Sequence, residues 1–157
     1  MIAGVGKVSG SASADIDAPL DRVWAIVADV EAWPEWQTTL SAVDVEERDP
    51  EGRPSLCEVI FDAKVQTIRT VQRLGYEPSL SLGFSQERGS LKSLHGSWRL
   101  EDLGDGCTRA TYELEAEPGG FLNMLVKGAV EERLREVLVL RLPGELKARA
   151  EAAEVQS

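Results

Sequence analysis

Two arginines, Arg69 and Arg73, are the residues of this chain best suited to binding a polar ligand. They are four residues apart on a predicted strand, so both side chains lie on one face, with Val71 between them. A guanidinium group that faces an interior cavity can bind an acidic or carbonyl-bearing ligand through two directed hydrogen bonds. In the opposite register Ile68 and Leu74 face the interior and both arginines lie in solvent. The alternation alone leaves both registers open.

Large side chains on several predicted elements could line such a cavity. The candidates are Trp33, Trp36, Phe84, Trp98, Tyr112, Phe121, Met124 and Leu125. A plain hydrophobic core needs the same residue types, so each alone is compatible with ordinary packing. Gly128 lies within a predicted helix, where glycine costs about 1 kcal/mol relative to alanine. Either close packing or room for a ligand would explain it. Tyr112 could also donate a proton or a hydrogen bond.

The sequence offers few other groups for catalysis. His95 is the only histidine, and it alternates out of phase with Gly96 and Trp98, so we expect it to face away from the cavity. No Ser/His/Asp set and no phosphate-binding glycine-rich loop stands out. Cys57 and Cys107 lie on separate predicted strands without a Cys-x-x-Cys motif, which favours two buried, inert thiols over a metal site. We therefore expect no metal and no cofactor.

Length and composition favour a single domain that spans residues 1–157 and buries about two thirds of its unfolded surface. The net charge of −10 disfavours nucleic acid and anionic membrane surfaces as partners, because both need a basic face. No 18-residue apolar run and no signal-peptide core is present, so we expect no integral membrane association and a cytoplasmic location. A monomer or a weak homodimer is expected.

The first half of the chain alternates between short helices and strands. A strand is predicted over Val8–Ile16, then a helix that starts near Pro19 and a second short helix from Val30. A period of two then predicts strands over 40–46, 57–62, 67–74, 79–85, 94–104 and 110–116.

The end of the chain changes period from 2 to 3.6. Gly104-Asp105-Gly106 predicts a hairpin between the last two strands. An amphipathic helix is predicted from Phe121 to Leu138. Pro143 should kink or interrupt it, because proline cannot donate to the carbonyl four residues back. A last helical stretch is predicted over 146–154.

The segment Asp17–Trp36 carries the clearest family signal. It follows the first strand and joins a proline-initiated helix to a second short helix that Trp33-Pro34 closes. This stretch resembles the entrance of the START/polyketide-cyclase (SRPBCC) superfamily. The resemblance implies an α+β helix-grip fold, in which a curved antiparallel sheet wraps around a long C-terminal helix and leaves an apolar cavity between them.

The same resemblance implies roles for two residues. Arg73 falls where polyketide aromatase/cyclases carry an arginine thought to position the polyketide. Trp33 matches a tryptophan at their pocket mouth, within the shared motif Glu31-Ala-Trp-Pro-Glu35. Two departures weaken that chemistry, because Leu40 replaces a pocket tyrosine and Val71 replaces a serine.

Three functional interpretations follow. The first is a binding or carrier protein for a hydrophobic small molecule, lipid or polyketide-like. The second is a polyketide aromatase/cyclase or dehydratase in which Arg73 polarises a carbonyl and Tyr112 relays a proton, which leaves enzymatic activity open. The third is an interaction module that acts through its surface. The first predicts an internal cavity above about 300 Å³, lined by Trp33, Phe84, Trp98, Tyr112 and Met124.

Overall fold

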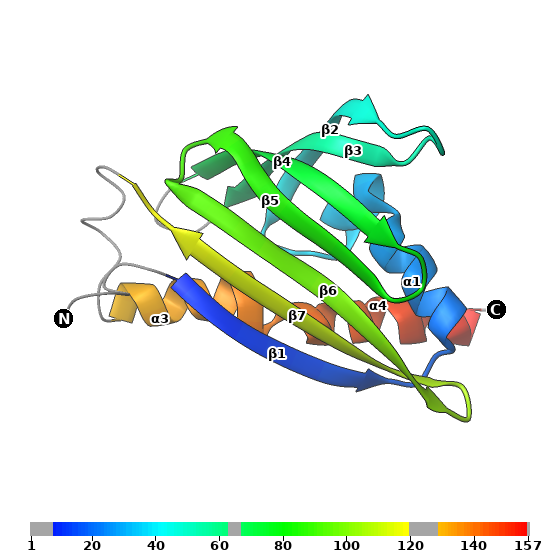
Figure 1. Ribbon diagram of the computed structural model, residues 1–157. Helices are drawn as coiled ribbons and strands as arrows, with labels where there is room; N and C mark the ends of the chain where they lie inside the picture. The colour runs from blue at the N-terminus through cyan, green and yellow to red at the C-terminus, as the bar shows by residue number, and fades with distance from the viewer. Residues whose placement is uncertain (1–7, 63–66, 120–128, 157) are drawn as a thin grey trace.

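The strands that the alternating pattern predicts form one sheet in the part of the chain that the structure describes. The computed structural model describes residues 8–62, 67–119 and 129–156. Its seven strands are β1 (Val8–Ile16), β2 (Leu40–Arg48), β3 (Pro54–Asp62), β4 (Thr67–Glu77), β5 (Ser81–Gly89), β6 (Ser93–Gly104) and β7 (Cys107–Glu117). All neighbouring strands are antiparallel, in the order β1-β7-β6-β5-β4-β3-β2. Figure 1 shows the curvature of this sheet.

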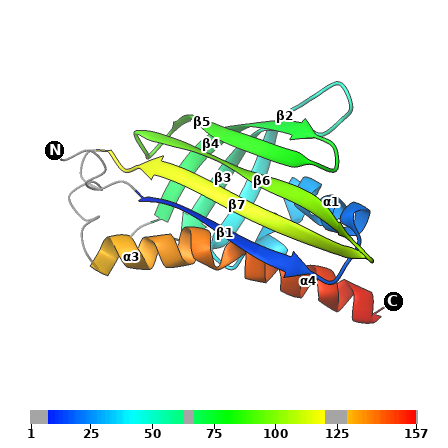
Figure 2. The ribbon, with the colours of Figure 1, turned by 60° about the horizontal axis from the view of Figure 1, so that its bottom comes forward.

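The helices lie at the two places that the sequence predicts. The α-helix α1 (Leu20–Ala28) and the 3₁₀ helix η1 (Val30–Glu35) connect β1 to β2. The C-terminal helical part consists of α3 (Ala129–Arg135), the π-helical turn η2 (Glu136–Leu140) and α4 (Leu142–Gln156). Figure 2 shows these three segments in one line across the inner face of the sheet. The α+β helix-grip prediction is confirmed.

The predicted interruption of the C-terminal helix is found just before Pro143. In η2 the Arg141 N–H donates to the Glu136 carbonyl five residues back, at 3.2 Å. Pro143 lies in the first turn of α4 and has no N–H to offer the Val139 carbonyl, so a regular α-helical ladder cannot continue through it. The wider π-helical turn absorbs this mismatch and keeps α3 and α4 in line.

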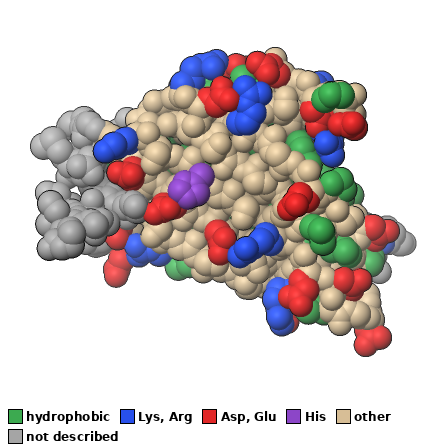
Figure 3. All heavy atoms as spheres, viewed as in Figure 1, with side chains coloured by type: hydrophobic (Ala, Val, Ile, Leu, Met, Phe, Trp, Pro, Cys, Tyr) green, Lys and Arg blue, Asp and Glu red, His purple; other side chains and the backbone are tan. Residues whose placement is uncertain are grey.

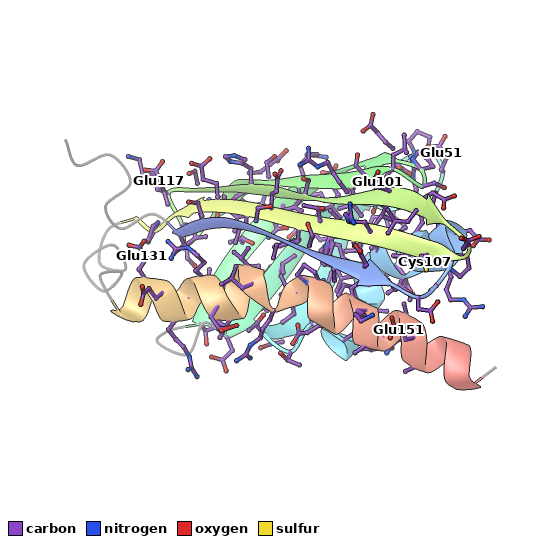
Figure 4. The ribbon with its side chains drawn as sticks, turned by 90° about the horizontal axis from the view of Figure 1, so that it is seen from below. Glu51, Glu101, Cys107, Glu117, Glu131 and Glu151 are labelled. Carbon is purple, nitrogen blue, oxygen red and sulfur yellow. The ribbon has the colours of Figure 1, made fainter. Side chains whose placement is uncertain are left out.

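Polar contacts fix both ends of this helical line on the rest of the fold. Near one end, Arg135 pairs with Glu131 at 2.8 Å and donates from Nε to the Ser9 carbonyl of β1 at 2.7 Å. Near the other end, Glu151 accepts from the Asp17 N–H at 2.9 Å. Figure 4 shows Glu131 and Glu151 near opposite ends of the line. The helical line therefore lies along β1, which all three of its segments contact.

The β6–β7 hairpin confirms the Gly104–Gly106 turn. All three residues have positive φ, with values of 86° for Gly104, 55° for Asp105 and 76° for Gly106. Glycine adopts this left-handed region without strain, which explains the two glycines. The tight turn sets the register that brings Trp98 of β6 opposite Tyr112 of β7.

Among the described residues, none of the helices has both the length and the apolar character that a membrane span requires.

Candidate ligand-binding pocket

Three aromatic side chains form a row on the inner face of the sheet. Phe84, Trp98 and Tyr112 come from β5, β6 and β7, and all three are buried. Trp98 and Tyr112 are direct partners across the two strands, with ring centroids 4.7 Å apart. The Phe84 and Tyr112 rings stack with centroids 6.0 Å apart. The alternation of β6 and β7 predicted the inward direction of Trp98 and Tyr112.

The segment after α1 adds two further tryptophans. Trp33 in η1 is buried and donates from Nε1 to the Val27 carbonyl of α1 at 2.9 Å, which fixes the indole in place. Trp36 is also buried, and its ring lies 5.9 Å from that of Trp98. The irregular backbone around Pro34 thus brings two indoles to the aromatic row of the sheet.

A small hollow lies between these groups. Its lining residues, which we call the aromatic pocket, are Trp33, Gln37, Leu40, Val59, Phe61, Gln72, Phe84, Trp98 and Tyr112. Four of them belong to the predicted cavity wall. The hollow has a volume of about 10 Å³, enough for about one water molecule.

A second hollow extends toward α3. Its lining, which we call the apolar pocket, consists of Val8, Phe61, Ile68, Leu91, Leu94, Leu114, Ala116, Pro118, Leu134 and Leu138. Its volume is about 30 Å³. Phe61 lines both pockets and forms part of the partition between them. Neither pocket reaches the predicted 300 Å³, so that expectation is not met by these two described hollows.

A larger depression of about 350 Å³ lies elsewhere, around the outward-facing side chains of β1, β6 and β7. His95 lies in it, 3.1 Å from Glu115, and Figure 3 shows the histidine on the open face of the sheet. The prediction that His95 faces away from the interior is confirmed. This depression is not the expected cavity between sheet and helix.

Arg69 and Arg73 do not face the interior, which corrects the interpretation that placed both guanidinium groups in the cavity. Both side chains lie on the outer face of β4, where Arg73 pairs with Glu87 at 2.6 Å and with Glu47 at 3.2 Å. Arg69 lies 3.7 Å from Glu58. The hydrogen bonds that Arg73 donates to Glu87 and, with a smaller effect, to Glu47 raise the pKa of its guanidinium group. The outer face supplies these carboxylates, whereas the interior would have buried two unpaired cations.

Two glutamines take the interior positions instead. Gln72 of β4 is 1% exposed and donates from Nε2 to the Thr70 hydroxyl at 2.8 Å. Gln37, between η1 and β2, is 5% exposed, and its Nε2 has no hydrogen-bond partner in the described residues. We did not select either from the sequence. One feature of the sequence did indicate Gln72. It alternates in step with Ile68 and Leu74, so it faces the interior in the register in which those two residues do.

The hydroxyl of Tyr112 is another polar group of the aromatic pocket. Burial raises the pKa of this phenol above its usual range, so the group stays protonated at neutral pH. It makes no hydrogen bond to the described part of the chain, and its ring is held by Phe84 and Trp98. Tyr112 can therefore donate a hydrogen bond to a ligand oxygen.

The two cysteines differ in environment. Cys57 is fully buried, and burial raises the pKa of its thiol to about 11, which makes it unreactive at neutral pH. Cys107 is only partly buried, which corrects the prediction of two buried thiols. Four predicted site residues, Phe121, Met124, Leu125 and Gly128, lie outside the described residues.

Comparison with known proteins places the chain in a family. The family model described as "Polyketide cyclase / dehydrase and lipid transport" matches residues 16–142, most of the chain. No curated protein matches it significantly.

Solved structures with the same fold cover nearly all of the chain. A START superfamily protein from Mycobacterium smegmatis has a TM-score of 0.80 at 20% identity, covering 92% of this chain and 98% of that one. An aromatase/cyclase from Streptomyces sp. R1128 has a TM-score of 0.71 at 16% identity, covering 92% and 94%. These identities establish a likeness of fold. With the family model matching so much of its length, the chain belongs to the polyketide cyclase / dehydrase and lipid transport family.

Proposed function

We propose that this protein binds a hydrophobic small molecule, lipid or polyketide-like, between the sheet and the C-terminal helices. The observation that carries the proposal is the aromatic pocket, where five aromatic side chains from η1 and four strands converge on one hollow. The apolar pocket continues it toward α3. Among the described residues that line the two pockets none is charged, which suits an apolar ligand.

A ligand of ordinary size needs more space than these two hollows offer, so binding within them requires their side chains to move. Phe61 is the side chain best placed to do this, because it borders both pockets and is only partly buried. Rotation of its ring would join the two hollows. A bound apolar body would then replace part of the packing that Phe61 gives up, at about 25 cal/mol per Å² of apolar surface removed from water.

Polyketide cyclisation is the second candidate, and Tyr112 is the observation that favours it. A buried, protonated phenol can hydrogen-bond a ketone oxygen and polarise it during ring closure. Arg73 has no part in this scheme, because it lies on the outer face. Tyr112→Phe should then reduce the rate of ring closure about 100-fold or more. In a pure carrier the same variant should alter affinity alone.

The interaction-module interpretation has less to support it. The exposed large hydrophobic side chains of the described residues are Leu80, Leu103 and Leu140. They belong to three different segments, namely the β4–β5 turn, β6 and η2.

Native mass spectrometry of freshly expressed protein tests the binding proposal. We expect a co-purifying small molecule on the wild-type chain. Val59→Phe should remove it, because Val59 is buried in the wall of the aromatic pocket and the larger ring fills the hollow. Ser85→Phe introduces the same ring at an exposed position of β5 and should keep the ligand. Retention of ligand by folded Val59→Phe would contradict this location.

A further inference from the structure

Gln37 presents a buried amide with an unused donor. Its backbone is fixed on both sides, since its N–H donates to the Trp33 carbonyl at 2.8 Å and its carbonyl accepts from the Leu40 N–H at 3.0 Å. The side chain lines the aromatic pocket and is 5% exposed, but Nε2 finds no partner in the described residues. Buried polar atoms are nearly always paired, so this donor needs an explanation.

The surroundings of Gln37 define what could pair with it. The indole Nε1 of Trp36, one residue away, is a second buried donor without a partner in the part of the chain described. Gln72, by contrast, already uses its Nε2 on Thr70. The buried side-chain atoms of Trp36 and Gln37 that lack a partner in the described residues are therefore both donors. Arg73, one of the two cations that the sequence analysis considered for the cavity, is held on the outer face by Glu87 and Glu47.

We infer that the ligand carries an uncharged hydrogen-bond acceptor, a ketone-like carbonyl oxygen, on an apolar body, and that Gln37 Nε2 donates to it. The inference rests on the proposed function and specifies its ligand class. A carbonyl oxygen satisfies the amide without bringing in a charge. A carboxylate would lose its hydration in a pocket whose described lining contains no cation, so the pocket discriminates against acids.

Three naphthalenes of similar shape test this by calorimetry at pH 8. They are 2-acetylnaphthalene with a ketone, 2-ethylnaphthalene without a polar group and 2-naphthoate with a charge. The ketone should bind about fivefold more tightly than the ethyl compound, the effect of one net hydrogen bond. The carboxylate should bind at least tenfold more weakly than the ketone. Equal affinity of ketone and ethyl compound, as when the amide keeps a water instead, would overturn the inference.

Variants of Gln37 test whether this residue causes the preference for the ketone. Gln37→Leu should abolish the preference for the ketone while leaving 2-ethylnaphthalene bound as before. Gln37→Met keeps the side-chain length and serves if the leucine variant does not fold. Thr39→Val is the matched control, because Thr39 is also buried, lies two residues away and is not part of the pocket wall. A ketone preference that survives in folded Gln37 variants would overturn the assignment. Absence of binding by all three compounds would instead contradict the proposed function and the inference with it.

Discussion

The ring of Phe84 lies against Gly96, its partner residue on the neighbouring strand, at the place where Gly96 would carry a side chain. A Cβ atom built on Gly96 would lie 2.7 Å from Phe84 Cζ and would also meet the Glu113 carbonyl oxygen. A Cβ atom does not approach a non-bonded heavy atom this closely, so Phe84 can take this position only because residue 96 is a glycine. The aromatic pocket therefore depends on the absence of one side chain as well as on the large groups that line it.

Gly96→Ala should destabilise the fold by about 1–3 kcal/mol, because the added methyl group forces Phe84 and the β7 backbone to shift. Denaturant unfolding measures this directly. Gly83→Ala is the matched control on the adjacent strand, since its Cβ would meet nothing closer than 3.9 Å. That change should be neutral or slightly stabilising. Equal losses in the two variants would mean that Phe84 does not depend on Gly96.

Trp98→Ala should destabilise the fold by about 3–5 kcal/mol. Trp98 is 1% exposed and contacts the rings of Tyr112 and Trp36, so its removal leaves a large cavity at the centre of the inner face. The free energy of unfolding is the quantity to measure. A loss below about 1 kcal/mol would show that Trp98 borders open space rather than packed atoms.

Arg73→Met should leave ligand affinity unchanged. The side chain lies on the outer face and pairs with Glu47 and Glu87, so its removal affects exposed ion pairs and no pocket wall. Exposed pairs contribute about 0–1 kcal/mol, and the stability change should stay in that range. The affinity of the variant for 2-acetylnaphthalene checks the placement. A tenfold loss of affinity would show that Arg73 is part of the ligand site and would contradict its placement on the outer face.

The Arg73–Glu87 pair should also give the fold a measurable acid sensitivity. The hydrogen bond from Arg73 lowers the pKa of the Glu87 carboxyl below its ordinary value of 4.5. A group with a lowered folded-state pKa stabilises the fold above its unfolded-state pKa, and this contribution is lost as pH falls through the folded value. Stability should therefore decline below about pH 4.5, and less steeply in Glu87→Gln. Melting temperatures between pH 6 and 3 test this, and parallel curves for the two proteins would contradict it.

The inner faces of β6 and β7 were predictable because each shows one clean alternation. Leu94, Gly96, Trp98 and Leu100 share one phase, and His95 has the other. β4 was not predictable in this way, since both of its phases mix apolar and polar residues. The carboxylates of Glu47 and Glu87, which come from β2 and β5, reach Arg73 only in the folded sheet, so the sequence of β4 by itself does not reveal them.

The candidate site was predictable in its large residues and not in its polar ones. Phe84, Trp98 and Tyr112 were selected by size and phase, and Trp33 by its size and its place in the Glu31–Glu35 motif. The four residues meet at one hollow. Gln37 lies in a short irregular link between η1 and β2, where no period indicates which way a side chain points. The volume of the pocket depends on how Phe61 and its neighbours pack, and residue types alone do not determine that.

The most direct test of ligand binding in the aromatic pocket is an NMR titration of the indole N–H resonances with 2-acetylnaphthalene. Three of the four tryptophans belong to this region, because Trp33 and Trp98 line the pocket and Trp36 contacts Trp98. Trp24 on α1 is not part of the pocket wall and serves as the internal control. Saturable shifts of the Trp33, Trp36 and Trp98 signals, with Trp24 unchanged, are the predicted result. Shifts confined to Trp24, or no saturable shift at all, would contradict the account.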